Sequence, residues 1–190
     1  MSMRFLKYAS WIVLVPLDII TGVLAILFAP FVVPFYNEKT GHLPKGFRWM
    51  ETFDNPIDGD GGHIRRWASI RYHLGDFGVY MQRVGWLWRN KAYNFAYHVL
   101  GREATSKFNW KGNPKTEGGP NPVNHGYLLM WNESAWGLYV YKPWLQIHKV
   151  QFCLRVYAGW KLKQEVSDPV NLDRAMLAFH FNPFRYYVIK

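Results

Sequence analysis

The chain contains a single cysteine, Cys153, among its 190 residues. One cysteine excludes an intrachain disulfide and a zinc site built only from cysteines. Acidic residues are also few, since 13 of them face 23 Lys and Arg and leave a formal net charge of +10. Such an excess attracts anionic lipid headgroups, nucleic acid or an acidic partner. Because an apolar segment is also present, we expect headgroups in preference to nucleic acid.

The sequence also lacks the short motifs of the common enzyme classes. There is no G-x-S-x-G, Walker loop, G-x-G-x-x-G or H-E-x-x-H, and no pair of histidines at the spacing of a zinc site. We therefore predict no cofactor, no metal and, as the favoured reading, no catalytic residues. The sequence contains no internal repeat with a period of 20–50 residues, so it does not predict a repeat architecture.

The N-terminal segment, residues 1–36, is strongly apolar. No Lys, Arg, Glu or His lies between Lys7 and Glu38, and residues 9–29 supply about the ~20 residues that a helix needs to cross a bilayer. The basic start resembles that of a signal peptide, but the apolar stretch is too long and no cleavage pattern follows it. We predict an uncleaved membrane-inserting helix with a cytoplasmic N-terminus.

Three residues make this helix unusual: Trp11, Pro16 and Asp18 are the candidate membrane or assembly residues. A proline in a helix interior favours a kink, and a carboxylate near mid-bilayer needs a partner, water or a headgroup. Three structures satisfy this: a kinked spanning helix that oligomerises around Asp18, a helix broken so that Asp18 is an N-cap, or an apolar helix buried against protein.

The rest of the chain predicts an α+β fold. Residues 37–110 contain a connector, an Asp-rich turn and an amphipathic helix, whose apolar residues recur three or four apart over residues 77–88. Residues 111–190 contain runs typical of strands at 126–131, 135–144, 150–163 and 174–181. We predict an antiparallel meander of about four strands, with 37–190 as one globular domain.

The polar loop at residues 54–63 (DNPIDGDGGH) is the leading candidate for chemistry. Asn-Pro and Asp-Gly are turn dipeptides, so a turn is the favoured reading. One alternative is a cation held by Asp54, Asp58 and Asp60, although the register does not fit an EF-hand. The other is catalysis, with Asp58 and Asp60 as carboxylates and His63 as proton carrier.

Arginines alternate with tryptophans in the helical middle, which is typical of a surface at headgroup level. The alternatives are cation–π packing within the protein and base stacking. The candidate headgroup or partner residues are Arg65, Arg66, Trp67, Arg71, Arg83, Trp86, Trp88 and Arg89.

Several segments together resemble an uncharacterised family of small membrane-associated proteins encoded by tailed bacteriophages. They are PLDI at residues 16–19, LP at 43–44, DNPIDGD at 54–60, RVGWLWRNKAYNFAYHVLG at 83–101 and LRVYAGWKLK at 154–163. The resemblance implies a phage origin and adds no catalytic residue.

We therefore expect a non-enzymatic phage-encoded protein at the inner membrane of an infected bacterium, or in the virion. It would engage the envelope during genome delivery, or modify the membrane early in infection. Its partners would be a bilayer or a hydrophobic protein surface, as a homo-oligomer or within a larger assembly. The alternatives are a membrane-bound enzyme that uses residues 54–63, and a structural subunit whose apolar N-terminus packs against protein.

Overall fold

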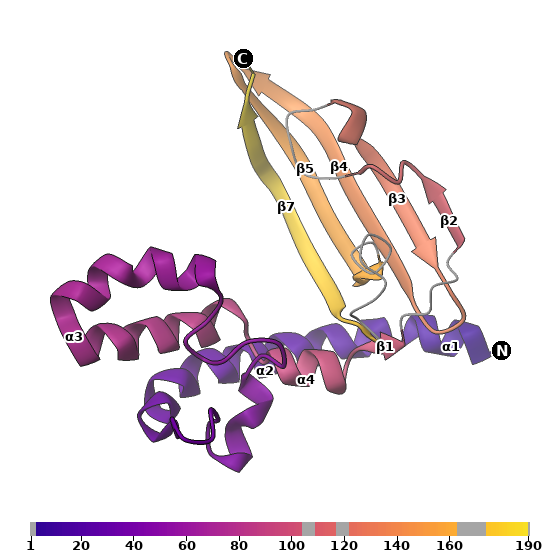
Figure 1. Ribbon diagram of the computed structural model, residues 1–190. Coiled ribbons are helices and arrows are strands. Elements are labelled where there is room, and N and C mark those ends of the chain that lie inside the picture. Colours follow the sequence, from indigo (N-terminus) through magenta and orange to yellow (C-terminus); the bar gives the residue numbers. More distant parts are fainter. Residues whose placement is uncertain (1–2, 104–108, 117–121, 163–173, 190) are drawn as a thin grey trace. The chain divides into compact units, whose positions relative to one another are not determined.

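The computed structural model describes residues 3–103, 109–116, 122–162 and 174–189. The chain divides into two compact units (Figure 1). Unit 1 comprises Met1–Val15 and Leu100–Lys190, and unit 2 comprises Pro16–Val99. The prediction of an N-terminal apolar helix, a helical middle and C-terminal antiparallel strands is confirmed. The apolar segment contributes residues to both units.

The apolar segment forms helices α1 (Met3–Ala9) and α2 (Trp11–Val32), followed by the short 3-10 helix η1 (Val33–Phe35). Ser10 separates α1 from α2, and its Oγ donates to the Lys7 carbonyl oxygen at 2.6 Å. Helix α2 continues through Pro16, although a proline in a helix interior removes one backbone hydrogen bond. The alternative of a break at Asp18 is therefore wrong: Asp18 lies inside α2 and is not an N-cap.

Unit 2 also contains the 3-10 helix η2 (Lys45–Met50), α3 (Gly61–Arg89) and α4 (Tyr93–His98). Helix α3 consists of two arms that fold back on each other (Figure 1). The reversal occurs at Gly75, whose φ of 52° favours glycine. The buried core of unit 2 combines α2 with the connector and the second arm of α3: Ala25, Ala29, Val32, Val33, Leu43, Met50, Ile57, Val84, Trp86, Leu87 and Ala92.

Unit 1 is built around one antiparallel sheet. Its strands are β2 (Asn109–Gly112), β3 (Gly126–Trp131), β4 (Trp136–Ile147), β5 (Val150–Trp160) and β7 (Leu177–Val188), in the order β2-β3-β4-β5-β7. A further pair joins β1 (Arg102–Glu103) to β6 (Arg174–Ala175), and η3 (Pro122–Asn124) precedes β3. The prediction of about four strands is corrected to five in this sheet, since β2 adds to the edge at β3.

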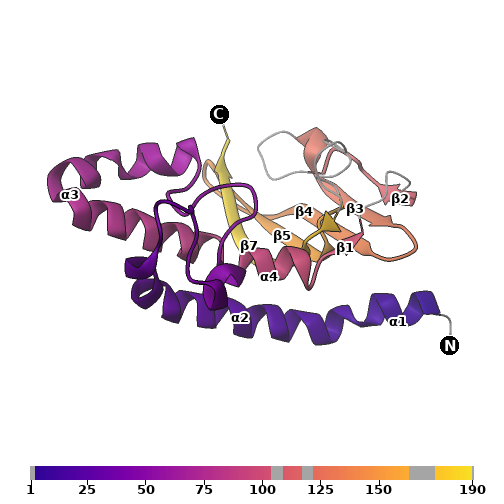
Figure 2. The same ribbon diagram turned by 60° about the horizontal axis from the view of Figure 1, so that its bottom comes forward.

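Burial alternates along β3 and β4, as expected of a sheet with two unlike faces. Leu128 and Met130 of β3 and Tyr139 and Tyr141 of β4 are buried on one face. On the other face, Trp11 of α2 packs against the end of the sheet, and Figure 2 shows the ribbon of α1 and the start of α2 passing that end. The ring centroid of Trp11 lies 5.5 Å from that of Trp136 and 5.9 Å from that of Phe179.

Candidate functional site

Within unit 2, one face of α2 is covered by protein. Gly22, Ala25, Ala29 and Val32 are buried on it, and Asp18 is half-buried one turn before Gly22. The spacing of three and four residues places all five on one side of the helix. We call these five residues the covered stripe. The structure therefore places Asp18 toward protein, away from the opposite side of the helix.

The opposite side of α2 is exposed and entirely apolar. The exposed fraction reaches 71% at Val13 and 73% at Phe31, whereas it is 0% at Ala25 and Ala29. We call the exposed residues of α2 the outward face: Ile12, Val13, Pro16, Leu17, Ile19, Ile20, Val23, Leu24, Leu27, Phe28 and Phe31. Pro16 is exposed on this face.

The continuous helical stretch Arg4–Phe35 is the one helix among the described residues that is long and apolar enough to cross a membrane. It has 32 residues, and its most apolar window has a mean hydropathy of 2.6 with 22% of the window buried. A core helix of a soluble domain has the opposite distribution, with most of its apolar side chains buried. Packing within the described residues therefore leaves the outward face uncovered.

The polar loop at residues 54–63 is tied to α3 by ion pairs and a cap. Asp58 Oδ1 lies 2.8 Å from Arg83 Nε. Asp60 is the N-cap of α3, since its Oδ1 accepts from the backbone N–H of His63 at 2.6 Å, and its Oδ2 lies 3.4 Å from Arg89 Nη1. That backbone hydrogen bond, helped by Arg89, lowers the pKa of the Asp60 carboxyl below its usual value. These roles are those of a structural turn.

The other candidates in this loop do not converge on a common point. The His63 ring is buried against Trp86, with a centroid distance of 5.1 Å, and its Nε2 lies 2.9 Å from the Gln82 carbonyl oxygen. The Asp54 side chain is exposed. Among residues 3–103, 109–116, 122–162 and 174–189, no three His, Cys, Asp or Glu side chains lie close enough to hold a metal.

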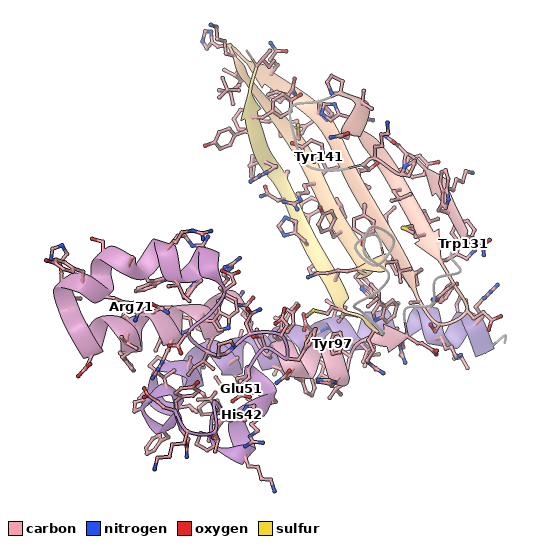
Figure 3. The ribbon with its side chains drawn as sticks, in the orientation of Figure 1. His42, Glu51, Arg71, Tyr97, Trp131 and Tyr141 are labelled. Carbon is pink, nitrogen blue, oxygen red and sulfur yellow. The ribbon has the colours of Figure 1, made fainter. Side chains whose placement is uncertain are left out.

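The arginines and tryptophans of the helical middle divide into an inner and an outer set. Trp86 is buried in the core, and Arg83 stacks on Tyr36 at 4.6 Å from the ring centroid. Trp67 is half-buried. The exposed members are Arg65, Arg66, Arg71, Trp88 and Arg89 (Arg71 is labelled in Figure 3). The structure thus supports cation–π packing for part of the set and leaves five residues at a surface.

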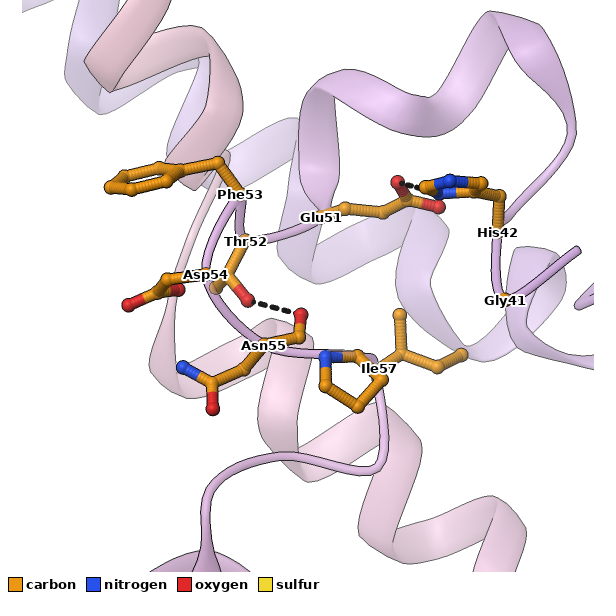
Figure 4. Close-up of a pocket in the computed structure, with 9 residues that line it drawn as sticks. Gly41, His42, Glu51, Thr52, Phe53, Asp54, Asn55 and Ile57 are labelled. Carbon is orange, nitrogen blue, oxygen red and sulfur yellow. Dashed lines mark hydrogen bonds and ion pairs between the residues drawn. The ribbon is translucent and has the colours of Figure 1, made fainter.

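Residues 41–42 and 51–57 of unit 2 line a small pocket of about 270 Å³ (Figure 4). His42 and Glu51 point toward one another in it, with 3.0 Å between His42 Nδ1 and Glu51 Oε2. The other Glu51 oxygen accepts from the backbone N–H of Leu43. Glu51 is buried, and both of its carboxylate oxygens are engaged by the connector, one by the His42 ring and one by the Leu43 backbone.

Comparison with known proteins places the chain in one family. A model described as a family of unknown function, DUF7338, matches residues 3–189. The chain belongs to this family. No curated protein and no solved structure matches it. Membership in this family assigns no activity to any residue of the chain.

Sequence reasoning missed the two unlike sides of α2 and the His42–Glu51 contact. The covered stripe carries a signal in the sequence, because the small residues Gly22, Ala25 and Ala29 repeat at helical spacing inside a run of large apolar residues. His42 and Glu51 are nine residues apart in an aperiodic connector, and no sequence pattern links them.

Proposed function

We propose that this chain is a non-enzymatic protein that attaches to a bilayer through the outward face of α2. The observation that carries the proposal is the distribution of burial on one helix. The covered stripe packs on unit 2, while every exposed residue of α2 is apolar.

A protein in water rarely leaves so long an apolar surface uncovered, and such surfaces mark contacts with a membrane or another protein. Full burial of one Val, Leu, Ile or Phe side chain contributes about 1.5–3 kcal/mol. Partial insertion of half a dozen such side chains therefore supplies on the order of 5–10 kcal/mol. That is sufficient for stable attachment without a lipid anchor.

We propose a non-enzymatic function because the candidate catalytic groups of the polar loop make structural contacts. Asp58 neutralises Arg83, Asp60 caps α3 and His63 belongs to the core. A catalytic reading would require these groups to leave their partners. The exposed residues Arg65, Arg66 and Arg71 support contact with anionic headgroups or with an acidic partner.

The resemblance noted from the sequence supports a tailed-phage origin. In that setting the protein would act at the inner membrane of the infected bacterium, either as a virion component during genome delivery or as an early membrane-modifying protein. Fractionation of infected cells separates the two versions. Protein found in purified particles favours the first, and protein found only in membranes favours the second. Protein found in particles and never in membranes overturns the attachment.

Flotation with vesicles tests attachment directly. The full chain, purified in detergent, is reconstituted with vesicles of phosphatidylethanolamine and phosphatidylglycerol and centrifuged through a density gradient. The double variant Ile20→Lys/Leu27→Lys places two charges on the outward face, where lysine is disfavoured. We expect at least a tenfold drop in the vesicle-bound to free ratio.

The matched control Thr40→Lys/Ser69→Lys adds the same two charges at exposed positions of unit 2. It should float like the unmodified chain, since electrostatic attraction to the vesicles is preserved. Equal flotation of both double variants, or no flotation of the unmodified chain, rejects the proposed function.

A further inference from the structure

The sheet end of unit 1 covers the beginning of the apolar helix. Tyr8 Oη donates to the Asn132 carbonyl oxygen, and Trp11 Nε1 donates to the Ala178 carbonyl oxygen at 3.2 Å. Val15 is buried as well. Residues 8–15 therefore have protein on one side.

Unit 2 covers the remainder of the same helix. Trp88 Nε1 donates to the Ile26 carbonyl oxygen at 2.9 Å, and Tyr80 Oη donates to the Pro30 carbonyl oxygen at 3.0 Å. Lys91 packs beside Gly22. Protein thus accompanies α2 from residue 22 to its end.

Only residues 16–21 separate the two covered stretches. Six helical residues extend about 9 Å, whereas the hydrocarbon core of a bilayer is about 30 Å thick. A helix that crossed the membrane would therefore draw one of its protein partners into hydrocarbon. On the unit 2 side that partner brings the ammonium group of Lys91, which the hydrocarbon strongly disfavours.

We propose that α2 lies in the plane of one leaflet and does not cross the bilayer. This inference rests on the proposed function and adds the orientation. In plane, the outward face meets acyl chains along its whole length, while the covered stripe and its protein partners stay at headgroup level or in water. Asp18 then lies on the headgroup side, where water can hydrate its charged carboxylate.

The charged residues near the helix fit a single leaflet rich in anionic lipid. Arg4 and Lys7 are exposed on α1, and Lys91 is exposed beside the middle of α2. In a spanning helix these groups would lie at different depths. An in-plane helix keeps basic groups out of the hydrocarbon, and each one that reaches the phosphates adds to the attraction.

Depth measurements at three positions of the outward face test the orientation. Val13→Cys, Ile20→Cys and Leu27→Cys are made one at a time and labelled with an environment-sensitive fluorophore. The full chain is reconstituted in the vesicles used for flotation, with lipids that carry nitroxides at a shallow or a deep acyl position. The ratio of quenching by the two lipids reports the depth of each label.

An in-plane helix gives the same ratio at all three positions. A spanning helix gives unequal ratios that are graded with distance from the bilayer centre, because successive positions seven residues apart differ by about 10 Å along the axis. A graded series overturns the in-plane inference and leaves attachment intact. Absence of quenching at all three positions rejects the proposed function itself, so the two failures are distinguishable.

Two controls complete the design. Gln146→Cys lies near the distal end of β4 in unit 1, ten residues along the strand from Trp136, and its label should not be quenched. Lys7→Cys and Lys39→Cys flank the apolar segment and are both exposed. An impermeant maleimide should reach both from the same side of sealed inner-membrane vesicles, and labelling from opposite sides overturns the inference.

Discussion

Lys91 packs along Gly22 on the covered stripe of α2. A β-carbon built at Gly22 would lie 3.5 Å from the Lys91 Cβ and 3.6 Å from its Cδ. Asp18 is one turn before Gly22 on the same side of the helix. Both distances to Lys91 are ordinary van der Waals contacts, so the site has room for a single β-carbon but not for a long side chain.

The first prediction concerns the size of the residue at position 22. Gly22→Ala should be tolerated and should raise stability by up to about 1 kcal/mol, because an alanine favours the helix interior and its Cβ makes an ordinary contact with Lys91. Gly22→Leu should displace Lys91 and lower stability. Urea unfolding of the detergent-solubilised chain, followed by tryptophan fluorescence, measures both. A loss of stability with alanine would contradict the packing.

The second prediction uses the same substitution at Gly78, with the opposite sign. A β-carbon there would lie 2.7 Å from Arg71 Cα and 2.7 Å from the Ile70 carbonyl oxygen. These are backbone atoms of the first arm of α3, so the arms would have to separate. Gly78→Ala should cost about 1–3 kcal/mol, in the unfolding assay used for Gly22→Ala. Equal effects of the two alanines would show that the arms are not in this contact.

The third prediction is a pH dependence of the α3 cap. The folded-state pKa of Asp60 is below its unfolded value, so the stability from the cap is present above the unfolded pKa. It is lost as the pH falls through the folded pKa. Asp60→Ala should lower the unfolding midpoint at pH 7, and this difference should vanish in strong acid. Asp60→Asn, which caps without titrating, should keep its advantage over alanine at both pH values.

The fourth prediction separates a structural from a catalytic role for Asp58. Its carboxylate is 2.8 Å from Arg83 Nε, and the Arg83 side chain is 15% exposed. Removing Asp58 leaves Arg83 with the exposed Glu38, so Asp58→Ala should destabilise unit 2. A double-mutant cycle with Arg83→Met should give a coupling of about 0.5–1.5 kcal/mol. An unchanged unfolding midpoint for Asp58→Ala would favour the enzyme alternative.

The strands were predictable where the sequence alternates and where the pairs are local. The run at 126–131 matches β3, and the runs that start at 135 and 150 match β4 and β5 to within a few residues. Strand β2 was missed because its four exposed residues, NWKG, precede a stretch rich in Pro and Gly. These residues form a strand because their backbone pairs with the edge of β3, which lies more than ten residues later in the sequence.

The candidate surface was harder to predict than the fold. Periodicity cannot separate two sides of a helix when nearly every residue is apolar, and Asp18 is the one charged residue of α2. The reversal at Gly75 was also missed, because the helical spacing was recognised only from Phe77 onward. Without the reversal of α3 at Gly75, the buried position of Trp86 could not be distinguished from the exposed position of Trp88.

The last prediction concerns Cys153, which is fully buried in β5. Burial raises the pKa of its thiol and also raises the pKa of the neighbouring Tyr141 to about 12. The thiolate is the reactive form, so Cys153 should react with a disulfide reagent at pH 8 only after unfolding in SDS. The release of chromophore before and after SDS measures this. Rapid reaction of the folded chain would place Cys153 at an opening of the sheet, and it would remove the unlabelled background that the depth and sidedness measurements require.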